Sequence, residues 1–289
     1  MSGWRVRAGW RALIYSLLLA GMTIAEILLL EWIRPPWLRP EPRMTVGYEA
    51  INEALLLVPV FMATAVMAGF ERQSVFSYGL AGPKPLRNLS NGLLCGIAAL
   101  SFLILLLLGG GLAQTHWRGL SVLGILGQGV AWLGVSWLIG LTEEMAFRGY
   151  LLQTLARGMG FWPAALVTSL LFASLHITNA DETVIGIINV FGAGMILCLA
   201  LKRSFSLWWS IGFHAGWDYS ENFIYGTHDS GQACAGALLN TLPHGPLWFS
   251  GGLAGPEGSL LGLGVEVLAA AGIYVFLRPQ ARKTPGAAS

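Results

Sequence analysis

The chain has 289 residues, of which 55% are hydrophobic and 11% are charged, with a formal net charge of +2 and a mean hydropathy of +0.62. A typical soluble domain carries about 25% charged residues, so this composition excludes a disordered chain, a nucleic-acid-binding module and most soluble enzymes. What remains is an all-α, polytopic membrane protein that has the lipid bilayer as a partner and no nucleic-acid partner.

Eight segments are apolar and long enough to cross a bilayer, since a spanning helix needs about 20 mostly apolar residues. They are residues 11–31, 48–70, 89–113, 121–148, 162–179, 183–201, 204–224 and 258–277. Arginines precede the first segment, as in a signal peptide, but its apolar run from Ala12 to Leu30 is longer than a usual signal core. We therefore predict an uncleaved first span and a single membrane domain over residues 1–289.

The basic residues support this count of spans. If the N-terminus is cytoplasmic and all eight helices span, thirteen of the 17 basic residues face the cytoplasm. These are Arg5, Arg7, Arg11, Arg72, Lys84, Arg87, Arg148, Arg157, Lys202, Arg203, Arg278, Arg282 and Lys283, and the other four are Arg34, Arg39, Arg43 and Arg118. The positive-inside rule predicts such an asymmetry. We expect both termini to be cytoplasmic, and the compact chain favours a prokaryotic cell (inner) membrane.

The fourth span carries charges near its cytoplasmic end, in the run LTEEMAFRGY over residues 141–150. The apolar helical pattern resumes afterwards and continues to about Ala156. A helix that ends there is too long to begin at Gly119 and lie within the bilayer, so we expect it to start near Gln128 and to project into the cytoplasm.

The spacing of these charges separates two acidic residues by role. Glu144 and Arg148 are four residues apart, so they share a helix face and can pair. Glu143 is turned about 100° away and has no local cation, which makes it a candidate general base. By charge count alone, a charge cluster at the membrane interface explains the run equally well.

Two further spans carry polar pairs at one-turn spacing. Phe172 and His176 face one way in the fifth span, and His214 and Asp218 do so in the seventh, with Asn222 one turn further. A lone His–Asp pair can be a clamp between helices. Because an ionisable group inside a membrane is costly, three helices with polar faces favour one buried hydrophilic chamber.

The ordered set Glu143-Glu144-x-x-x-Arg148, Phe172-x-x-x-His176 and His214-x-x-x-Asp218 resembles the three motifs of the CAAX protease and bacteriocin-processing family. This family, also called the abortive-infection family, includes the type II CAAX prenyl endopeptidases. The stretch that resembles the family core covers residues 120–225. The resemblance implies an intramembrane endopeptidase that uses a glutamate and water near the cytoplasmic side. Its substrates would be lipidated proteins with prenylated CAAX tails, or bacteriocin-related peptides.

The resemblance also implies roles for individual residues. Glu143 would activate water, His176 would hold that water, and Glu144 and Arg148 would orient the site. His214 and Asp218 would lie where the family stabilises the oxyanion. The third motif often ends in Asn, so Asp218 departs from the usual pattern. Either a protonated Asp218 donates to the oxyanion, or Asp218 orients and charges His214 and leaves it as the donor.

Alternative functions stay open at this point. Glu143, His176 and His214 could form a His₂-carboxylate zinc site, although no His-Glu-x-x-His helix is present and the expected mechanism needs no cofactor. An ion-coupled transporter also buries Glu and His, but no repeated halves are evident. A non-catalytic immunity protein is a third possibility. The sequence does not indicate an oligomeric state.

The remaining polar residues of the spans receive structural interpretations. Glu26, Glu31 and Glu53 are expected to be interface charges that pair with Arg34, Arg39 or Arg43. Glu266 is expected to contact the bundle interior without a catalytic role, Asn189 to hydrogen-bond toward the chamber, and Gly192 and Gly194 to permit close helix packing. His228 and His244 belong to the outer loop, residues 225–257, on the wrong side for a site that faces the cytoplasm.

Overall fold

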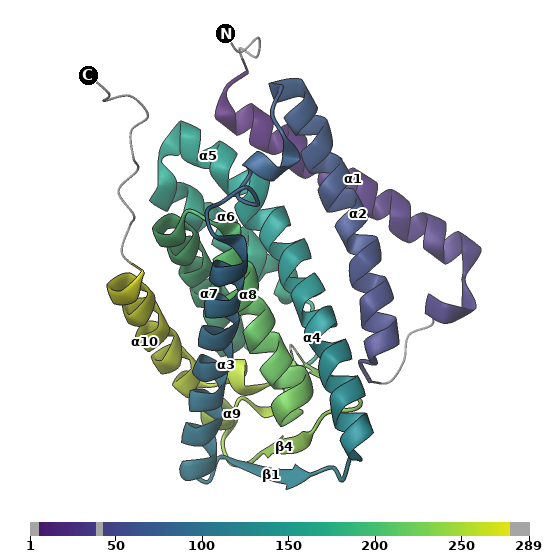
Figure 1. Cartoon of the computed structure of the whole chain (residues 1–289), viewed down its shortest axis with the longest axis vertical. Coiled ribbons are helices and arrows are strands. Elements are labelled where there is room, and N and C mark those ends of the chain that lie inside the picture. Colours follow the sequence, from purple (N-terminus) through teal and green to yellow (C-terminus); the bar gives the residue numbers. More distant parts are fainter. Residues whose placement is uncertain (1–5, 39–42, 230, 278–289) are drawn as a thin grey trace.

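In a bilayer no water satisfies exposed backbone groups, so apolar runs of this chain form helices. The computed structural model describes residues 6–38, 43–229 and 231–277, and it is mostly helical (Figure 1). Its longer helices are α1 (Ala8–Ile33), α2 (Val46–Glu71), α3 (Pro85–Gly109), α4 (Val122–Glu144), α6 (Phe161–His176), α7 (Val184–Ser204), α8 (Leu207–Tyr219) and α10 (Leu260–Phe276). The π-helical turn η3 (Met145–Leu151) and α5 (Leu152–Met159) follow α4, and the π-helical turn η4 (Ser220–Tyr225) follows α8.

Each of the eight predicted spans contains one of these longer helices. Five helices in the described part of the chain are long and apolar enough to cross a membrane: α1, α2, α3, the continuous helix Val122–Met159, and α7. The apolar helices α6 and α10 have 16 and 17 residues, and α8 has 13 before η4 extends it. An all-α membrane protein is therefore the observed fold class. The count of eight crossings stays a prediction.

Both ends of the described chain lie at the same end of the bundle. Near its start, Arg11 pairs with Glu71 at the end of α2, with 3.2 Å between Nη1 and Oε1. Near its end, Arg203 at the end of α7 donates from Nε to the carbonyl of Leu277 at 2.6 Å. The linker between α2 and α3 lies here too, since the N–H of Leu207 donates to the carbonyl of Gly79. This agrees with an even number of crossings, and the cytoplasmic location of this end stays a prediction.

The helix that carries the acidic pair starts earlier than we predicted. It begins at Val122 rather than near Gln128, because the Ser121 hydroxyl caps it by accepting from the N–H of Gly124. It also does not run straight to its end. Gly149 leaves the helical conformation inside η3, at φ −72° and ψ −111°, and the chain bends there before α5.

Two pairs of glycines bring α3 and α8 into backbone contact. A Cβ atom at Gly92 or Gly96 would lie 2.2 or 2.1 Å from a carbonyl oxygen of α8. A Cβ atom at Gly212 or Gly216 would lie 2.2 Å from a carbonyl oxygen of α3. Both helices thus use a small-xxx-small pattern, which allows membrane helices to approach closely. This contact holds α8, the helix of His214, in place.

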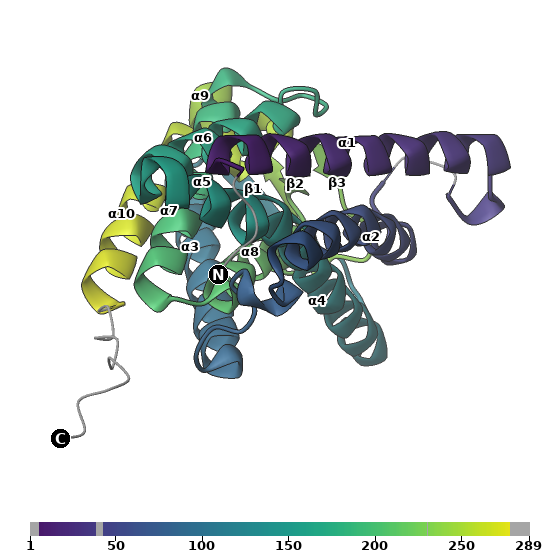
Figure 2. The ribbon, with the colours of Figure 1, turned by 90° about the horizontal axis from the view of Figure 1, so that it is seen from above.

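Helix α1 is packed much more loosely. In the most apolar 18-residue stretch of α1 only 6% of the residues are buried, against 50% in that of α7. The buried residues of α1 are Ala12 and Tyr15, near its start. The Tyr15 hydroxyl donates to the carbonyl of Ala146 at 3.3 Å. Beyond this anchor α1 leans away from the rest of the bundle, as the view from above shows (Figure 2).

Loops cover the opposite end of the bundle. Strand β1 (Ala113–Trp117) pairs antiparallel with β4 (Leu239–Pro243), and β2 (His228–Asp229) pairs with β3 (Gln232–Ala233). The short helix α9 (Leu247–Ser250) and two 3-10 turns, η5 (Gly252–Ala254) and η6 (Pro256–Gly258), lead into α10. The outer loop is therefore folded rather than extended.

The charge assignment needs one correction. Arg148 is fully buried in the bundle, so it is not one of the surface charges that indicate topology. It stays inside because Glu144 neutralises it there. Arg5, Arg39, Arg278, Arg282 and Lys283 lie outside the described residues.

Candidate active site

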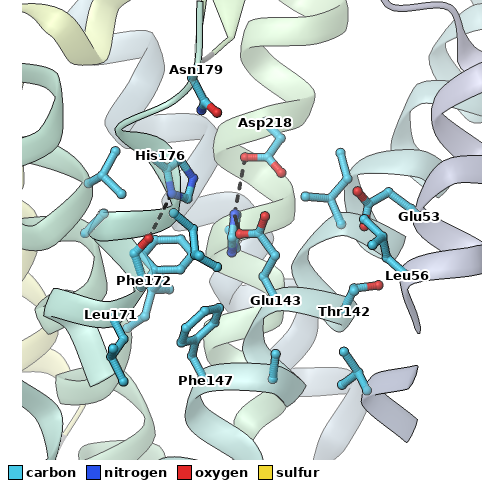
Figure 3. A pocket seen from close by; sticks show the side chains of 18 of the residues that line it. Glu53, Leu56, Thr142, Glu143, Phe147, Leu171, Phe172, His176, Asn179 and Asp218 are labelled. Atoms are coloured by element: carbon cyan, nitrogen blue, oxygen red, sulfur yellow. Dashed lines mark hydrogen bonds and ion pairs between the residues drawn. The ribbon is translucent and has the colours of Figure 1, made fainter. Parts of the chain in front are cut away.

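The three motifs meet around one cavity of about 880 Å³, as the sequence predicts. Glu143 from α4, Phe172 and His176 from α6, and His214 and Asp218 from α8 line it. Figure 3 shows Glu143, His176 and Asp218 pointing toward a common space. Three helices thus bring together residues that lie up to 75 positions apart in the sequence.

The predicted pair between Glu144 and Arg148 is confirmed. Arg148 Nη1 lies 2.9 Å from Glu144 Oε1, and both side chains are fully buried. The guanidinium of Arg148 also lies 4.4 Å from the ring centre of Phe172, a cation–π contact. Neither residue lines the cavity. The pair therefore connects the first motif to Phe172 of the second motif outside the cavity wall.

His214 is held by a carboxylate on each side of its ring. Its Nδ1 lies 3.2 Å from Glu144 Oε1, and its Nε2 lies 3.5 Å from Glu143 Oε2. Asp218 Oδ1 is 3.8 Å from the same Nε2. A carboxylate can only accept, so Nδ1–H donates to Glu144. The Glu144–Arg148 pair therefore fixes the direction in which Nε2 of His214 points into the cavity.

His176 ends α6 and is oriented by its own helix. Its Nδ1 lies 3.0 Å from the carbonyl oxygen of Phe172, one turn earlier. Since a carbonyl cannot donate, Nδ1 carries a proton, and in the neutral ring Nε2 is then an acceptor. The rings of His176 and Phe172 are 4.7 Å apart between centroids, which further limits rotation of the imidazole.

Glu143 is the more accessible acid of the first motif. Its side chain is 30% exposed, whereas that of Glu144 is fully buried. This difference follows from their angular separation on the helix. The sequence argument that Glu143 faces the chamber while Glu144 is tied to Arg148 is thus confirmed in geometry.

Helix α2 contributes acidic residues that sequence reasoning missed. Glu49, Asn52 and Glu53 line the cavity, and both glutamates are buried. Glu53 faces Glu143 across the chamber (Figure 3). The interpretation of Glu53 as an interface charge is therefore wrong, because α2 turns this face toward α4. The signal was available, since Glu49 and Glu53 are one helical turn apart.

The expected ion pairs of the outer acids with Arg34 and Arg43 do not form, whereas the alternative partner Arg39 lies outside the described residues. Within the described ranges, none of Glu26, Glu31 and Glu53 forms an ion pair with Arg34 or Arg43. Arg34 instead donates from Nε to the backbone carbonyl of Glu31 at 3.2 Å. Beyond its anchor at Arg11, α1 leans away from the bundle, and Glu31 and Arg34 at its far end are exposed.

The outer loop reaches into the same cavity. Asp229, Gln232 and Glu257 line it, while His228 and His244 do not. Asn222 donates from Nδ2 to Asp229 Oδ2 at 2.8 Å, which ties the loop to the end of α8. Burial raises the pKa of the Asp229 carboxyl above its ordinary value, and the Asn222 amide opposes this shift. No sequence signal indicated this contact, because the loop has no helical periodicity.

The predicted placements of Asn189, Glu266, Gly192 and Gly194 in the bundle interior agree with the structure. Asn189 is buried, lines the cavity and donates from Nδ2 to the carbonyl of Ser259 at 3.0 Å. Glu266 is buried and lines the cavity beside Gly192, where a Cβ atom would lie 2.1 Å from its Oε2. A Cβ atom at Gly194 would lie 3.0 Å from Arg148 Nη2. The two glycines thus leave room for buried charged side chains.

The side chains that lie close enough together to share a metal ion are not the Glu143, His176 and His214 of the zinc alternative. In the described part of the chain, three potential ligands lie within 4.8 Å of one another at Asp218, Glu221 and Asp229. Glu143, His176 and His214 do not form such a group. They therefore do not fit a shared zinc ion in this geometry.

A second charged cluster lies around Glu71, at the end of the bundle where both ends of the described chain lie. Arg11 and Arg157 each approach its carboxylate at 3.2 Å, and the hydroxyls of Tyr78 and Tyr150 donate to it. Burial, together with Glu71, raises the pKa of Tyr78 to about 12, so this tyrosine stays a donor. The cluster connects the start of α1, the end of α2 and the end of α5.

Comparison with known proteins identifies the segment that carries the site. Residues 98–220 match the family model described as type II CAAX prenyl endopeptidase Rce1-like. No protein of curated function and no solved structure matches the chain. The match confirms the resemblance stated from the three motifs, and it supports a membrane protease, a hydrolase of the CAAX prenyl protease class. Glu53, Glu221 and Asp229 lie outside the matched segment.

Proposed function

We propose that the protein is an intramembrane endopeptidase that needs no catalytic metal and in which Glu143 activates water, since residues 98–220 match the Rce1-like model of type II CAAX prenyl endopeptidases. The observation that carries this proposal is the pairing of an accessible carboxylate with an oriented imidazole. Glu143 Oε2 lies 3.5 Å from His214 Nε2, and His176 lines the same cavity. Peptide hydrolysis needs a base for water and a donor for the oxyanion.

The reaction begins with a water held between Glu143 and His176. The water gives one proton to the Glu143 carboxylate, and its other hydrogen is bonded to the acceptor Nε2 of His176. The oxygen attacks the peptide carbonyl carbon, and the carbonyl electron pair moves to its oxygen. His214 donates from Nε2 to this oxyanion.

The intermediate then collapses to products. The carbonyl re-forms, the C–N bond breaks, and Glu143 returns its proton to the leaving amine. Glu144 and Arg148 are positioning residues, because they touch His214 and Phe172 rather than the cavity. Asp218, 3.8 Å from His214 Nε2, charges and orients that ring.

The shape of the cavity supports a lipidated peptide as the substrate class. Its walls include apolar residues from α1, α2, α6 and α7, such as Leu19, Leu56, Leu175 and Val190. Its polar residues lie where α4, α6 and α8 meet. A prenyl chain would enter sideways beside α1, and the peptide would lie against Glu143. The cytoplasmic face and a prokaryotic inner membrane are part of this proposal.

Cleavage assays with purified protein test this function. The wild-type protein in lipid nanodiscs is incubated with a farnesylated CAAX peptide and with an unprenylated membrane-anchored peptide. Glu143→Gln keeps the shape of the side chain and removes the base, so we expect a loss of about 10²–10⁴-fold in kcat. Glu31→Gln, on the exposed part of α1, is the matched control and should retain full activity. Equal cleavage by wild type and Glu143→Gln would defeat the proposal.

Two further measurements separate the mechanistic alternatives. Full activity after chelation, with Ca²⁺ and Mg²⁺ resupplied, supports a reaction without a catalytic metal, and activity that returns only with Zn²⁺ contradicts it. Asp218→Asn tests the third motif: a large loss of kcat supports the orienting role, and retained turnover supports direct donation to the oxyanion. A reporter fused after Ser289 that is active only outside the cytoplasm would contradict the proposed topology.

A further inference from the structure

Three carboxylates gather where α8 meets the outer loop. Asp218 ends the third motif, Glu221 lies in η4, and Asp229 lies in β2. One oxygen of each lies within 4.8 Å of the others. Glu257 is close enough to interact electrostatically with both Asp218 and Glu221. The three acids come from two parts of the chain that only the folded outer loop brings together.

Nearby side chains balance the charge of this group only in part. Glu221 is fully buried, and neither of its carboxylate oxygens accepts a hydrogen bond of ordinary geometry, although the Trp217 side chain is close enough to interact with it. Oδ2 of Asp218 is also buried without a partner. Among the residues that the structure describes, no Lys or Arg pairs with any of the three acids, and the one ion pair is Asp218 Oδ1 with His214 at 3.8 Å. Buried charges without partners are costly, so such groups are paired or bind metals.

The spacing and chemistry of the donors fit a hard divalent cation. Ca²⁺ binds oxygen ligands at about 2.3–2.6 Å, so ligands on opposite sides of the ion lie about 4.6–5.2 Å apart and adjacent ones lie closer. The three oxygens all lie within 4.8 Å of one another, as ligands of one such ion must. The group contains only oxygen donors, which favour Ca²⁺ or Mg²⁺ over zinc. Asn222 fixes the Asp229 carboxylate by donating to its Oδ2 at 2.8 Å.

We propose that Asp218, Glu221 and Asp229 bind one hard divalent cation of the Ca²⁺ or Mg²⁺ type. The ion bridges η4 and β2 and thereby holds the outer loop against the end of α8. Asp218 connects this site to the proposed reaction, because its Oδ1 lies 3.8 Å from His214 Nε2 and its Oδ2 is buried without a hydrogen-bond partner. The ion is structural and does not touch Glu143 or the scissile bond.

Metal content and thermal stability test this site without any assay of proteolysis. Purified protein in nanodiscs is stripped with a chelator, desalted, and titrated with CaCl₂ or MgCl₂ up to millimolar concentration. We expect about one bound equivalent by elemental analysis and a rise in Tm of several degrees, since a ligand that binds the folded state stabilises it. Glu221→Gln and Asp229→Asn should each weaken binding at least tenfold.

Matched variants make the result specific. Glu266→Gln removes a buried carboxylate of the same cavity outside the cluster, and Glu143→Gln removes the proposed base, so both should bind the cation as wild type does. In the chelated state Glu221→Gln should melt at a higher temperature than wild type, because it removes a buried unpaired charge. This comparison also shows directly that the variant folds.

Two results would overturn the site. One is wild-type protein that retains less than a tenth of an equivalent of metal and shows no Tm shift with either cation. The other is Glu221→Gln protein that still binds one equivalent with unchanged affinity. Neither result depends on peptide cleavage, so failure here is distinguishable from failure of the proposed protease activity.

Discussion

The two sides of the cavity are built by opposite kinds of packing. On one side α8 lies against α3 so closely that carbonyl oxygens occupy the space of glycine side chains. On the other side α1 is held near its start by Arg11, Ala12 and Tyr15, and its remaining length is largely exposed. Figure 1 shows α3 and α8 side by side in the bundle, with α1 inclined away on the far side of α2.

The difference separates two requirements of the proposed reaction. His214 and Asp218 need fixed positions relative to Glu143, and the contact of α3 with α8 gives them a rigid support. A lipidated substrate needs an opening toward the bilayer, and a loosely packed helix that lines the cavity provides one. Leu19, Thr23 and Ile24 of α1 line the cavity without being buried.

The largest effect should come from breaking the tight side. A Cβ atom at Gly216 would lie 2.2 Å from the carbonyl oxygen of Leu93, which is far closer than such atoms can approach. Gly216→Val therefore forces α3 and α8 apart. Overpacking usually costs about 1–3 kcal/mol, and we expect a larger cost here because the obstacle is backbone, which cannot yield as a flexible side chain does. We expect loss of the monodisperse folded protein in size-exclusion chromatography.

Its control is Gly264→Ala in α10, where a Cβ atom meets nothing within 4 Å. This variant should elute and melt as wild type does. A Gly216→Val protein with wild-type Tm would show that the glycine contact does not hold α8.

The next effect should come from the buried pair behind His214. Arg148→Met leaves Glu144 buried beside His214 without its cation, and breaking such a pair costs about 3–5 kcal/mol. Thermal unfolding in detergent measures the loss. The double variant Glu144→Gln/Arg148→Met should recover part of this stability, because no buried charge is then left unpaired. A single variant no less stable than the double variant would contradict the assignment.

A smaller effect is expected at the anchor of α1. Glu71→Gln removes the charge that Arg11 and Arg157 share, at 3.2 Å each. Arg157 is half exposed, so solvent already screens much of its pair. We expect a loss of about 1–2 kcal/mol, mostly from the buried hydrogen bonds of the carboxylate, measured by thermal unfolding. An unchanged Tm would mean that α1 is held by its apolar contacts alone.

The smallest effect should come from the exposed part of α1. Leu17 is 64% exposed, so Leu17→Ala should change the free energy of unfolding by less than about 0.5 kcal/mol. Leu100→Ala in α3, where the side chain is fully buried, is the matched comparison and should cost about 2–5 kcal/mol. Similar losses at both positions would remove the contrast between the two sides.

Much of the fold could be predicted because it depends on periodicities that lie within single helices. Apolar runs of sufficient length predicted all the long helices, and the one-turn spacings of Glu144 with Arg148 and of His214 with Asp218 predicted shared faces. The start of α4 was misplaced because a single serine cap at Ser121 outweighed the argument from bilayer thickness. The bend at Gly149 has no periodic signal that would indicate it.

The residues missed at the site share one property, which is that their position depends on how elements meet. Glu53 was assigned to the membrane interface because the sequence predicted its helix but did not indicate that the polar face of this helix is directed toward the cavity. Asp229 and Glu257 lie in a loop without periodicity, so nothing along the chain indicated that they fold back into the cavity. Glu221 is three residues from Asp218, and this spacing was the one available signal.

By itself, the sequence determined that this is a helical membrane protein with three polar motifs on three helices, because hydrophobic length and helical spacing are local properties. Only the tertiary structure decided which of those polar faces meet. It set Glu144 between Arg148 and His214, turned Glu53 toward Glu143, and brought the outer loop against Asp218. The physical reason is that helix rotation and loop placement follow from packing between elements, and here glycine contacts and buried charges decide that packing.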